Sequence, residues 1–264
     1  MLFEYVVGGA VVGAVVGATG VGGGSLMTPL LTLVFGLPAQ VAVGTDLLFA
    51  SITKFSGALT HWRRGNIHWP LTGWLALGSV PAALATIAAL RAWHPDPVQF
   101  ASIVRPALAA ALLLTAASLL FRSRIQSLGR LFVSAPIDAP ETGANAVRAL
   151  PTFLLGTVIG VMVTLTSVGA GAIGVVALLF LYPTLAAKRL VAVDIAHAIP
   201  LTLVAGLGHV ALGTVNWTVL GALLVGSVPA IALGALLADR LPERGLRVAL
   251  AMMLTLIGTR LVVV

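Results

Sequence analysis

The chain has 264 residues, of which 59% are hydrophobic and 9% are charged, and its mean hydropathy is +1.09. Soluble domains carry about 25% charged residues, so this composition excludes an ordinary soluble protein and indicates one that lies in lipid. The net charge of +7 does not indicate nucleic-acid binding, because the basic residues lie in short loops between apolar runs. The chain has no cysteine, which excludes disulfides and thiolate chemistry.

The first apolar segment, residues 3–35, contains a cluster of glycines at positions 17, 20, 22, 23 and 24. A glycine costs about 1 kcal/mol relative to alanine in a helix interior, so this cluster predicts a break in the helix. The freed backbone groups cannot face lipid, and the break must be buried in protein or line a watery cavity. The segment either crosses the membrane once or folds back as a re-entrant hairpin.

Ordinary membrane spans are expected where about 20 apolar residues follow one another. Four runs meet this requirement almost without charge, at residues 72–90, 106–120, 219–237 and 248–264. A polar segment, residues 122–148, separates the two halves, and its Pro136, Pro140 and Gly143 favour a surface loop.

The two halves are related in sequence. A shift of 148 residues places Asp46 on Asp194 and residues 78–81, Gly-Ser-Val-Pro, on the identical residues 226–229. A shift of 147 places the first glycine cluster on residues 167–171. We therefore predict an all-α polytopic membrane protein with two homologous halves, residues 1–121 and 149–264, joined by a cytoplasmic linker, 122–148. Each half has four membrane segments, the first of which is Gly-broken or re-entrant.

The distribution of basic residues favours the re-entrant arrangement. If each broken segment enters and leaves on one side, eleven basic residues share a face and three lie opposite. If each crosses once, the split is seven against seven, which violates the positive-inside rule. The predicted topology is therefore an inverted repeat with both termini periplasmic and the basic loops cytoplasmic. The eleven residues are Arg63, Arg64, Arg122, Arg124, Arg130, Arg148, Lys188, Arg189, Arg240, Arg244 and Arg247.

The two broken segments are the predicted substrate site. The N-terminus of a half-helix presents free amides and a partial positive charge, which attract anions, and in transporters built from inverted repeats such breaks meet near the membrane midplane. The alternative is that the glycines only allow close helix packing, as Gly9, Gly13, Gly156 and Gly160 are expected to do. The candidate binding residues are Thr19, Gly20, Gly22, Gly23, Gly24, Ser25, Thr166, Ser167, Gly169 and Gly171.

Ionisable side chains inside membrane spans are costly and mark functional positions. Five are candidates for coupling or for balancing the charge of an anion: Asp46, Lys54, Asp194, His197 and His209. Asp194 and His197 share a helix face and form a candidate proton-carrying pair. Local structural pairing is the alternative for each of them. No catalytic residue, metal site or cofactor is expected, because no cluster has ligand spacing or a nucleophile with its base.

A family resemblance adds to this interpretation. Residues 17–25, Gly-Ala-Thr-Gly-Val-Gly-Gly-Gly-Ser, followed by Gly44-Thr45-Asp46, resemble the sulfite exporter TauE/SafE family, also called toluene sulfonate uptake permeases. The resemblance covers nearly the whole chain. It implies an inner-membrane carrier of sulfite, thiosulfate, sulfoacetate or other organosulfonates. The second half departs from the glycine pattern, with Ser167 and Ala170 at matching positions.

Together these features predict a secondary transporter in the inner (plasma) membrane that exports small sulfur-containing anions by alternating access. Proton-coupled uptake of the same anions is the alternative. A non-transporting membrane subunit and an intramembrane enzyme are the two hypotheses from other classes. The expected partners are a sulfur oxyanion, the lipid bilayer and, for coupled uptake, protons.

Overall fold

A computed structural model of the chain describes residues 2–19, 24–132, 147–238 and 243–263. Within these ranges every regular element is helical. The elements are α1 (Leu2–Thr19), α2 (Gly24–Pro29), the π-helical turn η1 (Leu30–Val34), α3 (Ala39–Arg63), α4 (Trp69–Trp93), α5 (Pro97–Phe132), α6 (Ala149–Thr166), α7 (Ala172–Leu181), α8 (Ala187–Ala211), α9 (Trp217–Ala238) and α10 (Glu243–Val263).

Five helical stretches in the described part of the chain are long and apolar enough to cross a membrane: Trp69–Trp93, Pro97–Phe121, Ala149–Thr166, Ala187–Ala211 and Trp217–Gly234. The prediction of an all-α polytopic membrane protein is thereby confirmed at the level of fold class. Three of the four expected runs lie in these helices, and the fourth contains a shorter apolar stretch, Val248–Leu261. Helix α5 continues to Phe132, so the segment expected as a linker begins as helix.

Each broken segment folds back on itself. The rings of Tyr5, at the start of α1, and Phe35, after η1, lie 4.6 Å apart between centroids. In the second half, the Tyr182 hydroxyl at the end of α7 accepts from the backbone N–H of Arg148 at 3.0 Å and bonds the hydroxyl of Thr152 at 2.5 Å. The two ends of each segment therefore meet, and the glycine-rich break lies between them.

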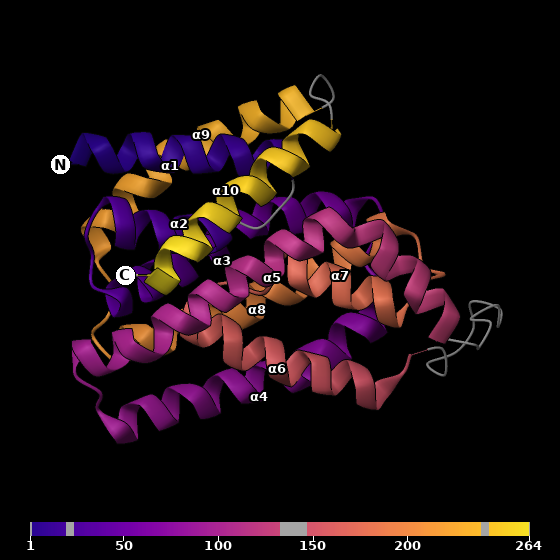
Figure 1. Ribbon diagram of the computed structural model, residues 1–264, viewed down its shortest axis with the longest axis horizontal. Coiled ribbons are helices and arrows are strands. Elements are labelled where there is room, and N and C mark those ends of the chain that lie inside the picture. Colours follow the sequence, from indigo (N-terminus) through magenta and orange to yellow (C-terminus); the bar gives the residue numbers. More distant parts are fainter. Residues whose placement is uncertain (1, 20–23, 133–146, 239–242, 264) are drawn as a thin grey trace.

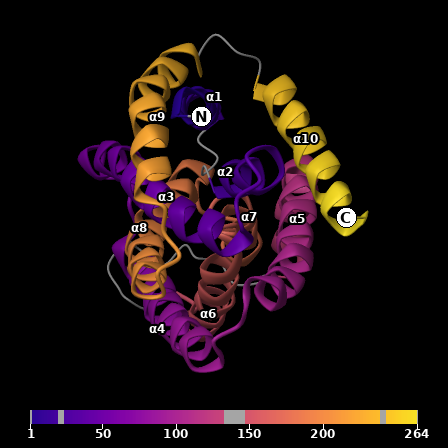
Figure 2. The ribbon, with the colours of Figure 1, turned by 90° about the vertical axis from the view of Figure 1, so that its left-hand side faces the viewer.

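The helices pack in pairs that repeat between the halves. Helix α1 packs along α9 and α6 packs along α4, while α3 packs against α8 and α5 against α10. Figure 2 shows the α1–α9 and α4–α6 pairs at opposite edges of the molecule, with α3, α8, α2 and α7 between them. This pairing is unchanged when the halves are exchanged, because α1 then replaces α6 and α9 replaces α4.

Loops gather at two ends of the helix bundle. At one end, α1 begins and α10 ends (Figure 1), and Gln40 donates to the carbonyls of Pro95 and Asp96 in the α4–α5 turn. At the other end, Gln126 of α5 donates to the carbonyl of Pro183 in the α7–α8 turn. His68, before α4, is within electrostatic reach of Arg189 at the same end.

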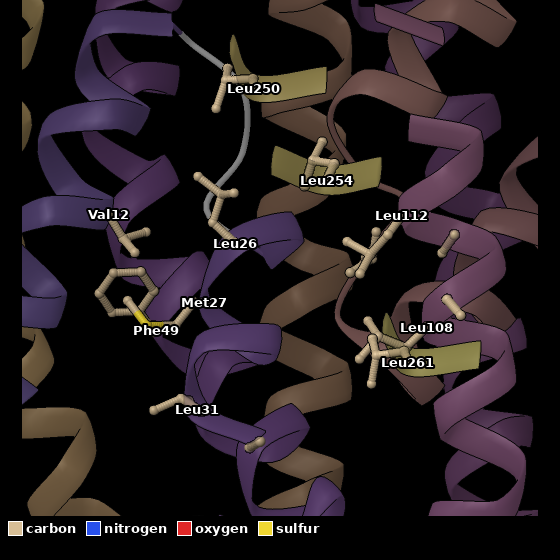
Figure 3. Close-up of a cluster of buried hydrophobic side chains, with 14 of the residues drawn as sticks. Val12, Leu26, Met27, Leu31, Phe49, Leu108, Leu112, Leu250, Leu254 and Leu261 are labelled. Carbon is tan, nitrogen blue, oxygen red and sulfur yellow. The ribbon is translucent and has the colours of Figure 1, made fainter. Parts of the chain in front are cut away.

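A buried apolar cluster joins the first broken segment to the outer helices. Figure 3 shows Val12 of α1 and Leu26 and Met27 of α2 near Phe49 of α3, with leucines of α5 and α10 on the other side. Met27 and Phe49 are fully buried. In lipid, such side chains are held by van der Waals packing and not by removal from water, so the close packing of this cluster keeps the α2 half-helix inside the protein.

Small residues set the closest helix contacts. A Cβ added at Gly226 of α9 would collide with the backbone of Val6 in α1, and one at Gly78 of α4 would collide with the backbone of Phe153 in α6. Gly13 and Gly160 meet Ser227 and Ser79 in the same two interfaces. The packing role expected for the glycines of α1 and α6 is therefore confirmed, and the two interfaces are equivalent.

We predict that Gly226→Leu destabilises the protein strongly, because its side chain would occupy the backbone of α1. Overpacking costs about 1–3 kcal/mol even where neighbouring side chains can move aside. The backbone of α1 cannot move aside in this way, so the cost at Gly226 is higher. The matched control is Gly221→Leu on the same helix, where nothing lies within 4 Å of an added Cβ. Thermal unfolding of the detergent-purified variants measures the effect. Equal melting temperatures for the two variants would contradict the packing described here.

Candidate functional site

The break between α6 and α7 is an irregular turn buried in the protein. Ser167 ends α6 in the left-handed conformation, with φ 59°, and Gly169 and Gly171 have φ 132° and 142°. These angles favour glycine at the last two positions. The Thr166 hydroxyl accepts from the N–H of Val168 at 3.1 Å. In the first turn of α7, the N–H of Gly174 donates to the carbonyl of Gly169 in the break at 3.1 Å.

The break in the first half lies between α1 and α2. Gly20, Gly22 and Gly23 lie outside the described residues, and Thr19 and Gly24 are the flanking ends of the two helices. Ser25 and Thr28 of α2 are buried. The geometry of the candidate site is therefore built on the second break and on the helices that contact both segments.

Asp46 on α3 is fully buried and links the two halves. Its Oδ2 accepts a hydrogen bond of 2.5 Å from the Thr28 hydroxyl of α2. The Ser167 side chain of the second break lies near the same carboxylate. Asp46 Oδ1 and Ser167 Oγ have no hydrogen-bond partner. One carboxylate thus faces both broken segments and retains an unused acceptor.

Asp194 on α8, which matches Asp46 in the repeat, is 2% exposed. Its carboxylate interacts with the backbone amide of Gly171, immediately before α7. Its Oδ1 lies against Gly174, where an added Cβ would collide with it, and this oxygen has no hydrogen-bond partner. The side chain of Asp194 therefore occupies the N-terminus of the α7 half-helix.

Lys54 on α3 supplies the positive charge of the cluster. The side chain is 8% exposed, and its Nζ donates to the carbonyl of Ala170 in the second break at 3.0 Å. The ammonium attracts both Asp194 and Asp46. Lys54 therefore ties α3 of the first half to the break of the second half.

The two histidines have different surroundings. His197 Nε2 bonds the hydroxyl of Ser79 on α4 at 2.8 Å, and its Nδ1 has no partner. His209 Nε2 lies 3.0 Å from the carbonyl of Thr164, and its Nδ1 lies 2.8 Å from the hydroxyl of Thr214. Because a carbonyl only accepts, Nε2 of His209 carries a proton. His209 is held at both nitrogens and fastens α8 to α6.

A cavity of about 260 Å³ opens near this histidine at the end of the bundle that contains the α4–α5 turn. Arg91 and His94 supply basic side chains to its wall, and His209 and Thr214 form part of it. His209 also lies beside Gly44, two residues before Asp46. One residue of the cavity wall, His209, therefore contacts α3 two residues before Asp46. Its lining residues are Gln40, Leu90, Arg91, His94, Pro95, Phe100, His209, Leu212 and Thr214.

The structure brings together Asp46, Lys54 and Asp194 with the second break, whereas His209 lies outside this cluster. Two contributors were not among the candidate residues: the carbonyl of Ala170, which accepts from Lys54, and Gly174, which makes room for Asp194. The repeat does not indicate Gly174, since the matching residue is Met27. No cluster of three His, Asp or Glu side chains that could hold a metal occurs in the described ranges.

Comparison with known proteins agrees with this architecture. Residues 5–261 match the family model described as sulfite exporter TauE/SafE. The chain is 37% identical over 223 residues to the probable membrane transporter protein YjnA of Bacillus subtilis, covering 84% of this chain and 85% of the relative. It is 28% identical over 212 residues to YdhB of the same organism, also a probable membrane transporter protein, covering 79% and 78%. No solved structure matches significantly. The chain therefore belongs to the sulfite exporter TauE/SafE family of membrane transporters.

Proposed function

We propose that this chain is a secondary transporter that moves small sulfur-containing anions across the inner membrane by alternating access. Sulfite, thiosulfate, sulfoacetate and other organosulfonates are the expected substrates. The family supports anion transport in general. The observation that carries the proposal is the buried ammonium of Lys54, 3.0 Å from the carbonyl of Ala170 inside a broken membrane helix.

The chemistry around the second break suits an oxyanion. A sulfonate or sulfite group accepts several hydrogen bonds at once, so it favours a site that combines a cation with amides and hydroxyls. Lys54 supplies the cation, residues 169–171 supply backbone amides, and Ser167 supplies a buried hydroxyl near Asp46. The amides of Ser167 and Val168 already bond the carbonyl of Val163 and the hydroxyl of Thr166. Residues 19–25 of the first break would complete the site from the other half.

Two related halves supply the moving parts. The equivalent pairs α1–α9 and α4–α6 each combine a helix of one half with a helix of the other, and they flank α3 and α8. In transporters of this kind, such units rock about a site near the midplane. Inverted repeats are part of the proposal. The first broken segment begins and ends at one end of the bundle, and the second begins and ends at the other end (Figure 1).

The cavity beside His209 is the proposed route to the site from one face. Its basic side chains, Arg91 and His94, would attract an anion by long-range electrostatics. His209 and Gly44 separate the cavity from Asp46. Rotation of the α4–α6 pair would open or close this separation, because His209 bonds the carbonyl of Thr164 in α6.

The direction of transport depends on charge compensation. An inside-negative potential of 100 mV contributes about 2.3 kcal/mol per charge toward expelling an anion, so export of an uncompensated anion is downhill. Uptake requires a compensating cation, for which a proton is the simplest choice. The two buried carboxylates beside Lys54 favour this second candidate function, proton-coupled uptake.

We predict an orientation with the basic face toward the cytoplasm. Because the chain lacks cysteine, single cysteines report each face without further mutation. Thr184→Cys in the α7–α8 turn should react with an impermeant maleimide only after intact cells are permeabilised, whereas Val98→Cys at the start of α5 should react before. Both positions are exposed. Labelling of both cysteines from the same side would contradict the proposed topology.

We predict selective anion flux in proteoliposomes, with sulfite, thiosulfate and sulfoacetate moving faster than chloride. Lys54→Met should lower the flux at least tenfold, since hydrogen bonds to charged groups contribute about 1.5–3 kcal/mol. The matched control is Lys188→Met, because Lys188 is the other lysine of the chain and is exposed at the start of α8.

Flux is measured with radiolabelled anions, and thermal unfolding confirms that both variants are folded. Absence of flux for every anion in the unmodified protein would contradict the proposed function and favour a non-transporting subunit. Equal flux through Lys54→Met and Lys188→Met would remove Lys54 from the site.

A further inference from the structure

The N-terminus of α7 already has an anion in its proximity, namely the carboxylate of Asp194. This helix has 10 residues, and Asp194 interacts with the amide of Gly171 immediately before it. Asp194 Oδ1 is buried, lies against Gly174 in the first turn of the helix, and has no hydrogen-bond partner. The protein's own carboxylate thus occupies the place where an anionic substrate would find amides and a partial positive charge.

The same carboxylate also competes for the cation. Lys54 attracts Asp194 and Asp46 at once, while its Nζ donates to the carbonyl of Ala170. With both carboxylates ionised and Lys54 protonated, the buried cluster carries a net charge of −1. A monovalent anion bound beside Lys54 would raise this to −2 in a buried site, where charges are screened less than at the surface, and this is strongly unfavourable.

From these contacts we infer that substrate binding displaces the Asp194 carboxylate from Lys54 and the α7 N-terminus, and that Asp194 takes up one proton as it is displaced. This inference rests on the proposed function and deepens it. An anion that enters with one proton leaves the charge of the cluster unchanged at −1. The unpartnered Oδ1 is the oxygen that receives the proton, and no bond other than O–H is formed.

Asp194, and not Asp46, is the carboxylate that is displaced and protonated. Asp46 keeps a 2.5 Å hydrogen bond from Thr28, which stabilises its charged form. The charged groups around Asp194 are few: Lys54 and Asp46 come from α3, and His197 shares its own helix. Helices α6 and α7, which also pack against α8, have no titratable residue. Helix α4, which packs against α8 as well, has one, the exposed Arg91.

The linkage has a consequence for energetics. A monovalent anion that moves together with a proton carries no net charge, so the membrane potential no longer drives it outward. The concentration gradient of the anion and the pH gradient then set the direction. The carrier then works as an anion–proton symporter. A proton concentration that is higher outside than inside drives accumulation of the substrate inside.

The test is the pH dependence of methanesulfonate binding, because this organosulfonate is monovalent and does not titrate between pH 6 and 8.5. In the unmodified protein the Kd should increase by about tenfold per pH unit in the alkaline part of this range, as one linked proton requires. Asp194→Asn should bind with a Kd that does not depend on pH. The control Asp96→Asn, which changes an exposed residue that caps α5, should keep the pH dependence of the unmodified protein.

A second measurement requires no variant. Proteoliposomes that contain a pH-sensitive dye should acidify inside when methanesulfonate is added outside. Binding without pH dependence, an Asp194→Asn variant that keeps the full pH dependence, or methanesulfonate flux without a change of internal pH would each overturn this inference while leaving anion transport intact. Absence of any anion binding or flux in the unmodified protein would instead contradict the proposed function.

Discussion

The structure depends on one constraint of the lipid environment: a helix broken inside a membrane must satisfy its free backbone groups within the protein. The second arms of the two broken segments, α2 and α7, accordingly lie in the middle of the bundle, between the α1–α9 and α4–α6 pairs (Figure 2). The second break places the carbonyl of Ala170 on Lys54 and the amide of Gly171 on Asp194. The need to satisfy backbone groups therefore also assembles the charged cluster.

The repeat makes the scaffold symmetric but leaves the site asymmetric. Asp46 and Asp194 match in the repeat, whereas Lys54 corresponds to Thr202 and His197 to Phe49. The hydroxyl of Thr202 bonds only within its own helix, to the carbonyls of Ala198 and Ile199. A single cation therefore serves two carboxylates. This imbalance is what gives one of the two aspartates a reason to bind a proton when an anion arrives.

Sequence patterns predicted the helical membrane fold, the small-residue interfaces and the positions of the two breaks, because hydrophobic run length and glycine content are local properties. They also singled out Lys54 and both aspartates as costly in lipid. They did not reveal that Lys54 bonds a carbonyl 116 residues away, nor that Gly174 makes room for Asp194. Those contacts arise where separate helices meet, between the halves for Lys54 and within the second half for Gly174, and no periodicity within one helix encodes them.

The most direct test of the central claim is to locate a bound anion. Crystals of the protein grown with selenite, an oxyanion like sulfite, allow the selenium to be found by its anomalous scattering. The account predicts a selenium peak whose oxygens lie about 3 Å from Lys54 Nζ or from the backbone amides of residues 169–171. A peak confined to the cavity wall at Arg91 and His94, with none beside Lys54, would contradict it.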